Sequence, residues 1–201
     1  MINLGILVSG RGSNLKAIID AVESGYINSA RIVAVISDKE NAQALGKARE
    51  KSIPTFFLDP KKFETKESFN LEIAQMMDRH KVDLIVLAGY MRILSKEFVE
   101  HFQWRIINIH PALLPSFPGL HPQRAALEYG VKISGCTVHF VTDEVDAGPI
   151  ILQYPVPVKK GDNEESLSER ILENEHKIYP RAIKLYIEKR LKIIGRHVEI
   201  L

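Results

Sequence analysis

Apolar runs alternate along the chain with segments whose apolar residues recur every three or four positions. Residues 1–8 form the first apolar run and predict a strand, after which Leu15, Ile18, Ile19 and Val22 recur at helical spacing. The same patterns predict further strands at 31–37, 55–58, 82–87, 106–110, 136–141 and 150–158, and helices at 42–51, 67–80, 95–99 and 123–129.

The C-terminal quarter predicts one long helix and a small hairpin. Asp162 or Asn163 is expected to cap the helix, and Pro180 is expected to kink it or divide it in two. Residues 191–201 place Gly195 between two short alternating runs, which favours a hairpin.

This alternation of strands and helices predicts an α/β fold with a Rossmann-like, doubly wound, mostly parallel sheet flanked by helices. Residues 84–87 are apolar throughout, as expected in the middle of a parallel sheet, whereas Pro155 and Pro157 indicate a strand near an edge. Because no repeat, low-complexity tract or linker interrupts the pattern, we expect residues 1–201 to form a single domain.

Residues 106–122 contain the most informative candidate chemistry. The segment begins as a buried strand on which Asn108 and His110, two positions apart, point to the same side. Prolines and a glycine follow closely, so the chain must leave the sheet as a stiff loop. An amide can stabilise an oxyanion and an imidazole can move a proton, which suits acyl chemistry. Either residue alone could simply end a strand, but Asp146 in the later acidic loop favours the functional interpretation.

The turn after the first strand, residues 9–14, is a candidate anion site. It joins a strand to a helix N-terminus, where free N–H groups and the helix dipole favour an anion. Leu15 replaces the third glycine of a dinucleotide fingerprint, and the Gly-Lys-Ser/Thr ending of a P-loop is missing. A single phosphate on a small substrate is therefore the preferred interpretation, and a tight turn without a ligand is an equal alternative.

Composition narrows the possible functions. Of the 201 residues, 45% are hydrophobic and 26% charged, which is ordinary for a globular protein. The net charge of +2 is spread along the chain, so no basic face predicts nucleic-acid binding. The apolar N-terminus is too short for a membrane span and lacks a signal peptide's basic region. The single cysteine, Cys136, is expected to be a small core or strand residue and is compatible with a reducing cytoplasm. The sequence has no HExxH, cysteine cluster or Gly-x-Ser-x-Gly elbow, so we expect no metal.

Several separated motifs together resemble the folate-dependent formyltransferase family. They are Asn108-x-His110-Pro111-x-Leu113-Leu114-Pro115 and Gly135-x-Thr137-Val138-x-Phe140-Val141-x-Asp143-x-Val145-Asp146-x-Gly148. The glycine turn at 9–14, the run Pro118-Gly119-Leu120-His121 and the late Glu175-His176-x-Ile178-Tyr179-Pro180 match a member that acts on a phosphoribosyl amine. The resemblance covers nearly the whole chain without large insertions.

The resemblance implies transfer of a formyl group from the co-substrate 10-formyltetrahydrofolate to the amine of 5′-phosphoribosylglycinamide in purine biosynthesis. It implies a catalytic trio of Asn108, His110 and Asp146. The implied substrate-binding residues are Gly12, Ser13, Asn14, Leu172, Glu173, Asn174 and Glu175. The implied folate-binding residues are Lys66, Met91, Arg92, Ile93, Leu94, Thr142, Asp143, Glu144, Val145 and Asp146. Lys66 stands where the family often has an arginine, so the charge is kept and the planar fork is lost.

The resemblance also implies that different parts of the chain have different roles. Residues 1–100 are expected to bind phosphate and ribotide, residues 101–190 to supply catalysis and the folate site, and residues 191–201 to form a tail. We expect small-molecule substrates only, with no nucleic acid or membrane partner, a monomer or homodimer, and a cytoplasmic location.

Three alternatives compete with this interpretation. A formyltetrahydrofolate hydrolase would share the trio but use water, and such proteins usually have an additional N-terminal regulatory domain. A methionyl-tRNA formyltransferase would need an RNA-binding domain and a basic surface. A non-catalytic nucleotide-binding module would account for the glycine turn but leaves Asn108, His110 and Asp146 without a role.

Overall fold

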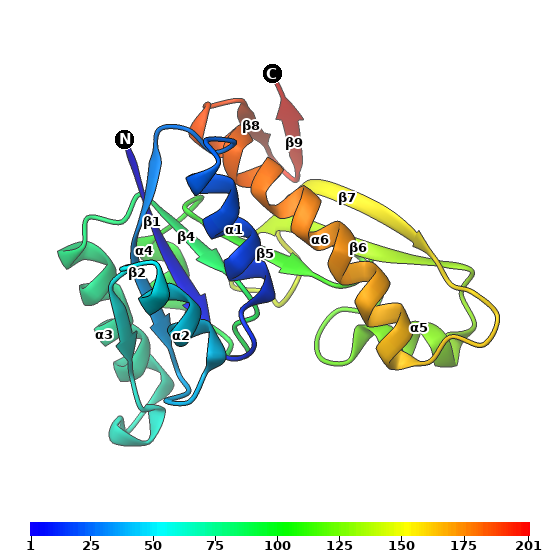
Figure 1. Cartoon of the computed structure of the whole chain (residues 1–201), viewed down its shortest axis with the longest axis horizontal. Coiled ribbons are helices and arrows are strands. Elements are labelled where there is room, and N and C mark those ends of the chain that lie inside the picture. The colour runs from blue at the N-terminus through cyan, green and yellow to red at the C-terminus, as the bar shows by residue number, and fades with distance from the viewer. The chain divides into compact units, whose positions relative to one another are not determined.

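The computed structural model describes residues 1–201 and contains a seven-stranded sheet in the order β3-β2-β1-β4-β5-β6-β7 (Figure 1). The strands are β1 (Ile2–Val8), β2 (Ala30–Ser37), β3 (Thr55–Phe57), β4 (Leu84–Leu87), β5 (Ile106–His110), β6 (Ile133–Phe140) and β7 (Ile150–Pro157). The helices are α1 (Ser13–Glu23), α2 (Gln43–Glu50), α3 (Lys66–Arg79), α4 (Lys96–His101), α5 (Pro122–Tyr129) and α6 (Glu164–Ile187). The predicted α/β class, with a mostly parallel sheet flanked by helices, is confirmed.

The chain divides into two compact units, and the first is Met1–Ile107. Within it β1 pairs in parallel with both β2 and β4, and β2 pairs in parallel with β3. Strands β1 and β4 are buried along most of their length because their residues are mostly aliphatic, as a sheet covered on both faces requires. A short 3₁₀ helix, η1 (Pro60–Lys62), was not predicted; the Asp59 carboxylate caps it by accepting from the Lys61 N–H at 3.0 Å.

The second unit is Asn108–Leu201. Its strands β6 and β7 are antiparallel, and β7 ends the sheet, as its prolines predicted. Strand β6 begins earlier than predicted because pairing with β7 already starts at Ile133, opposite Pro157. The predicted C-terminal hairpin is confirmed as β8 (Leu191–Ile194) and β9 (His197–Ile200).

Helix α6 corrects one prediction and confirms another. Asn163 caps it, and its side chain accepts from the Ser166 N–H at 2.8 Å. Pro180 does not divide the helix, which runs unbroken for 24 residues. Proline lacks one helical N–H, but Tyr179, Pro180 and Ile183 are all buried, so packing on both sides of the proline holds the helix together. No helix of the chain combines the length and apolar character needed to cross a bilayer.

Candidate active site

Strand β5 presents two polar side chains at its carboxyl end. Its other residues are apolar and buried, whereas Asn108 is partly accessible and His110 is 4% exposed. Because the residues alternate in direction along a strand, Asn108 and His110 share one side of β5, as predicted. A buried imidazole must find hydrogen-bond partners within the protein, and both of its ring nitrogens have them.

The partners of His110 come from the proline loop and from the acidic loop. Its Nε2 lies 2.8 Å from the carbonyl oxygen of Phe117, and its Nδ1 lies 3.3 Å from Oδ2 of Asp146. A carbonyl can only accept, so Nε2 bears the proton in this contact. The same Asp146 oxygen also accepts from the backbone N–H of Gly119 at 2.8 Å. Segments far apart in sequence thus converge on one imidazole–carboxylate pair.

A second histidine, which the sequence reasoning missed, connects this pair to Asn108. His139 lies on β6 and is 2% exposed. Its Nε2 is 3.3 Å from Nδ2 of Asn108 and 3.6 Å from Oδ1 of Asp146, while its Nδ1 lies 2.8 Å from the Phe140 carbonyl oxygen. The structure therefore brings Asn108, His110 and Asp146 together, with His139 between the amide and the carboxylate.

The electrostatics of the group are set by burial and by mutual charge. Burial lowers the pKa of His110 below its ordinary value, although the Asp146 carboxylate and the Phe117 carbonyl act in the opposite direction. Burial is also the strongest influence on the pKa of Asp146 and raises it. The Gly119 N–H, which donates to Oδ2, and the charge of His110 act in the opposite direction, and the pKa of Asp146 lies below its ordinary value. Asp146 is therefore a carboxylate at neutral pH and stabilises positive charge on His110.

Asp146→Asn is expected to lower the pKa of His110 further. The carboxylate stabilises the imidazolium, and removing its charge leaves the burial that disfavours the charged form. Turnover should fall and its pH profile should shift. NMR titration of the His110 ring would measure the change directly. Asp78→Asn, which removes a carboxylate 2.9 Å from the exposed His101, is the matched control and should leave the pKa of His110 unchanged. A rise in that pKa in Asp146→Asn would contradict this account.

Two further polar residues hold the start of the proline loop in place. Thr137 donates to the Ala112 carbonyl at 2.7 Å and accepts from the Leu114 N–H at 3.0 Å. Gln153 on β7 donates to the Leu114 carbonyl at 2.8 Å. Thr137 and His139 are two apart on a mostly apolar strand, the same signal that identified Asn108 and His110. That signal marks Thr137 and His139 as candidate site residues but does not give their position relative to β5.

The backbone around Asp146 is unusual in two respects. Asp146 has a positive φ of 51°, a left-handed conformation that costs a non-glycine residue about 1–3 kcal/mol. Gly148 lies so close to the Phe140 carbonyl that a Cβ there would sit 1.8 Å from its oxygen. The tight approach of the acidic loop to the end of β6 thus requires glycine at 148, and it places Asp146 next to His139 and His110.

In the first unit, the glycine turn leads directly into α1. Gly12 is the N-cap residue with φ 71°, α1 has no side-chain cap, and its first turn contains no acidic residue. Ser13 is half-buried and Asn14 is 8% exposed. These features leave the N-terminus of α1 suited to an anion. Gly12 also has a purely structural reason to be glycine, because a Cβ there would lie 2.6 Å from the Ala44 Cβ.

Gly12→Val is therefore expected to destabilise the fold whether or not the turn binds a ligand. The left-handed φ and the clash with Ala44 together should lower the free energy of unfolding by about 2–6 kcal/mol. Urea unfolding would measure the loss. Gly10→Ala is the control, since a Cβ at Gly10 meets nothing within 4 Å and its φ is not positive. Equal stability of the two variants would contradict the packing argument.

The first unit also contains half of the predicted folate residues. Met91 and Ile93 are 62% and 59% exposed, whereas Leu94 is buried. Arg92 lies 5.3 Å from the centre of the Phe69 ring, and its guanidinium is 4.0 Å from the buried carboxylate of Asp38. Lys66 is the first residue of α3, half-exposed, with Nζ 4.0 Å from the Glu67 carboxylate. In the second unit, Thr142 is half-buried, and Asp143, Glu144 and Val145 are exposed. Their assignment to folate stays a prediction.

The predicted ribotide segment, 172–175, lies within α6 and is largely turned inward. Leu172 is half-buried and Glu173 is exposed, while Asn174 and Glu175 are buried. Asn174 donates to the Arg170 carbonyl at 2.9 Å. Burial, together with the charge of Glu175, raises the pKa of Cys136 to about 12, so Cys136 is a thiol and not a nucleophilic thiolate. Cys136 is fully buried, as expected for a core residue.

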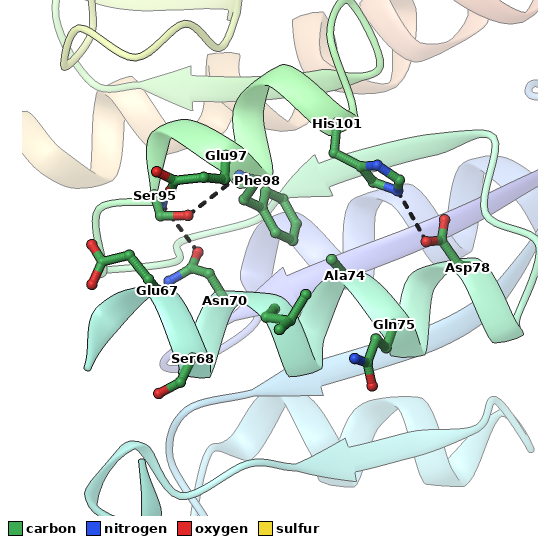
Figure 2. Close-up of a pocket in the computed structure, with 11 residues that line it drawn as sticks. Glu67, Ser68, Asn70, Ala74, Gln75, Asp78, Ser95, Glu97, Phe98 and His101 are labelled. Carbon is green, nitrogen blue, oxygen red and sulfur yellow. Dashed lines mark hydrogen bonds and ion pairs between the residues drawn. The ribbon is translucent and has the colours of Figure 1, made fainter. Parts of the chain in front are cut away.

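A groove of about 570 Å³ lies between α3 and α4 and contains none of the predicted site residues (Figure 2). Leu71, Ala74 and Phe98 give it an apolar lining. At one end the Asn70 side chain accepts from the Ser95 N–H at 3.3 Å, and at the other Asp78 pairs with His101 at 2.9 Å. These polar contacts tie the two helices together, and the groove has no acid–base pair comparable to His110 and Asp146.

A buried imidazole–carboxylate pair beside a side-chain amide, at the carboxyl end of a strand inside an α/β sheet, is the arrangement of an acyl-transfer enzyme. Comparison with known proteins gives the family. Residues 2–183 match the family model described as Formyl transferase, and the chain belongs to that family. The predicted family and the prediction of a transferase are both confirmed.

Individual relatives agree with this assignment. The chain is 47% identical over 191 residues to the phosphoribosylglycinamide formyltransferase of Escherichia coli K12, covering 95% of this chain and 90% of the relative. The crystal structure of glycinamide ribonucleotide transformylase 1 from Symbiobacterium toebii is 50% identical with a TM-score of 0.98, covering 100% and 94% of the two chains. A formyltetrahydrofolate deformylase from Pseudomonas syringae pv. tomato is 29% identical with a TM-score of 0.91, covering 100% of this chain and 66% of the deformylase.

Proposed function

We propose that this chain transfers the formyl group of 10-formyltetrahydrofolate to the amine of 5′-phosphoribosylglycinamide, giving the formylated ribotide in purine biosynthesis. The contact of His110 with Asp146, 3.3 Å apart beside Asn108, is the observation that supports it most. Relatives named for this activity are 47% and 50% identical over nearly their full length, whereas the deformylase is 29% identical. Formyl transfer to the ribotide is therefore favoured over hydrolysis.

The residues of the site suit direct attack of the amine on the formyl carbon. Attack forms a C–N bond and moves the carbonyl electron pair onto oxygen, giving a tetrahedral intermediate with an anionic oxygen and a cationic nitrogen. An Asn108 N–H donates to that oxygen. His110 donates its Nε2 proton toward the oxygen, exchanging the Phe117 carbonyl for a substrate acceptor. Collapse returns the electron pair, breaks the bond to the folate nitrogen, and moves the proton of the amine to that leaving nitrogen.

The two substrates are assigned to different segments. Gly12, Ser13 and Asn14 bind the phosphate at the N-terminus of α1, and residues 172–175 bind the remainder of the ribotide. Residues 91–94 and 142–146, with Lys66, bind the folate, for which the exposed Met91 and Ile93 offer apolar surface. The phosphate is thus assigned to residues 1–100 and catalysis to residues 101–190, while the ribotide and folate assignments each draw residues from both ranges, in a monomer or homodimer located in the cytoplasm.

One assay tests the proposal. The purified chain is incubated with 10-formyltetrahydrofolate, with and without 5′-phosphoribosylglycinamide, and both tetrahydrofolate release and formylated ribotide are measured. The expected result is folate release that depends on the ribotide and equals ribotide formylation. Release at the same rate without ribotide would support the hydrolase instead, and the absence of any release would favour a non-catalytic binding module.

A further inference from the structure

We propose that His139 is a positioning residue for this reaction: its neutral ring accepts a hydrogen bond from the Asn108 amide and so turns the second amide N–H toward the formyl oxygen. The inference rests on the proposed function and adds a residue that the catalytic trio does not include. It follows from the contacts of one buried ring.

The first step is the position of the proton on His139. Nδ1 lies 2.8 Å from the Phe140 carbonyl oxygen, which can only accept, so Nδ1 bears the proton. In the neutral ring Nε2 is then an acceptor with no proton of its own. His139 is 2% exposed, so no bulk water competes for this nitrogen.

The second step is the consequence for Asn108. Its side-chain nitrogen Nδ2 lies 3.3 Å from Nε2 of His139. An acceptor at Nε2 can be satisfied only by the NH₂ end of the amide, because the amide oxygen has no proton to give. The ring therefore selects one of the two orientations of the amide. One N–H is committed to His139, and the other remains free to donate to the developing oxyanion.

The competing partner of the same nitrogen is Asp146, whose Oδ1 lies 3.6 Å away. That separation is longer than an ordinary hydrogen bond, whereas the separation from Asn108 falls closer to the normal range. If the ring gained a proton at Nε2, it would donate to Asp146, and the Asn108 amide would have to present its oxygen to the ring. The amide would then be flipped, so that its NH₂ group points away from the His139 ring and neither N–H keeps its present direction. His110, Asp146 and Asn108 are the polar groups that surround the ring, together with the Phe140 carbonyl.

The test uses two substitutions of similar size in the full chain. His139→Leu fills the space but offers no acceptor, and His139→Gln can place a carbonyl oxygen near Asn108. His139→Leu is expected to lower kcat by about 10²–10³-fold, the usual loss for one oxyanion donor, with little change in either KM. His139→Gln is expected to recover most of that loss. His101→Gln, a change at an exposed histidine outside the site, should leave kcat unchanged. Circular dichroism and thermal unfolding establish that each variant is folded.

A double cycle separates action through Asn108 from action through Asp146. His139→Leu should cost little in an Asn108→Ala background, since the amide it orients is gone, but should still cost most of its effect in an Asp146→Asn background. In addition, ¹⁵N NMR of wild type should show the His139 ring proton on Nδ1 and an unprotonated Nε2. Equal losses in the Leu and Gln variants, additive losses with Asn108→Ala, or a proton on Nε2 would overturn the inference. Failure of wild type to formylate the ribotide would instead overturn the proposed function.

Discussion

His110→Ala is expected to lower turnover by about 10²–10⁴-fold, the usual loss when an acid–base group is removed. The imidazole is the group whose Nε2 proton faces an acceptor and whose Nδ1 faces a carboxylate, so it can donate to the developing oxyanion while Asp146 balances the positive charge of the protonated ring. His110→Ala removes the proton and leaves the Gly119 N–H as the hydrogen-bond donor to Asp146. Binding of the two substrates should change much less than kcat.

The measurement is steady-state formylation of 5′-phosphoribosylglycinamide, with KM for each substrate obtained separately. His101→Ala is a matched control because His101 also pairs with an aspartate, at 2.9 Å, but is exposed and lies outside the predicted site. Thermal unfolding shows whether the buried substitution has affected the fold. A folded His110→Ala variant with near-normal kcat would remove the imidazole from the mechanism.

The order of elements could be predicted from sequence because strand and helix periodicities are local properties. Residues 106–110 are buried and extended, and the two-residue spacing of Asn108 and His110 was enough to place both on one side. The same spacing argument was available for Thr137 and His139 on β6. It did not single them out, because nothing in a sequence states which residue of β6 lies beside which residue of β5.

The contacts that complete the site depend on loops whose shape is not periodic. Phe117 reaches His110 from a loop in which Phe117 itself has a positive φ of 53°. Asp146 reaches the same ring because the loop after β6 turns sharply, with Asp146 left-handed and Gly148 against the Phe140 carbonyl. Such turns are determined by tertiary packing, which can impose conformations that local preference disfavours. A composition of glycine and proline predicts that a loop exists but not where its carbonyls point.

Helix α6 illustrates a local rule overridden by packing. Proline disfavours a helix interior by about 3 kcal/mol, and on that basis Pro180 was expected to kink the helix or divide it in two. The apolar residues on both sides of it are buried, and their burial contributes more than the proline costs, at roughly 1.5–3 kcal/mol for each large side chain. The helix that results is long enough to present both the Asn163 cap and the segment 172–175 on one element.

Removing the phosphate from the ribotide is expected to weaken its binding by about two to four orders of magnitude, because charge-assisted hydrogen bonds contribute roughly 1.5–3 kcal/mol each. This prediction tests whether the turn before α1 binds an anion or is only a turn. The structure supports both: α1 begins without a side-chain cap, and Gly12 is needed in any case to avoid Ala44. The Gly12→Val variant cannot distinguish an anion site from a turn without a ligand, because it should disturb folding by itself.

Ser13→Ala can distinguish the two alternatives, since it removes one hydroxyl from the first residue of α1 without a change in backbone conformation. If the hydroxyl donates to the phosphate, the variant should lose about 10–150-fold in affinity for the phosphorylated ribotide and almost nothing for the dephosphorylated one. Ser24→Ala, at the opposite end of the same helix, is the matched control, and its hydroxyl donates only to the Ala21 carbonyl at 3.3 Å. Titration of both ligands against wild type and both variants gives a double cycle of protein substitution against removal of the phosphate.

Strong non-additivity for Ser13, and none for Ser24, means that the Ser13 hydroxyl and the phosphate are in contact. Additive effects at Ser13 in a folded protein would mean that residues 9–14 form a turn and that the phosphate binds elsewhere.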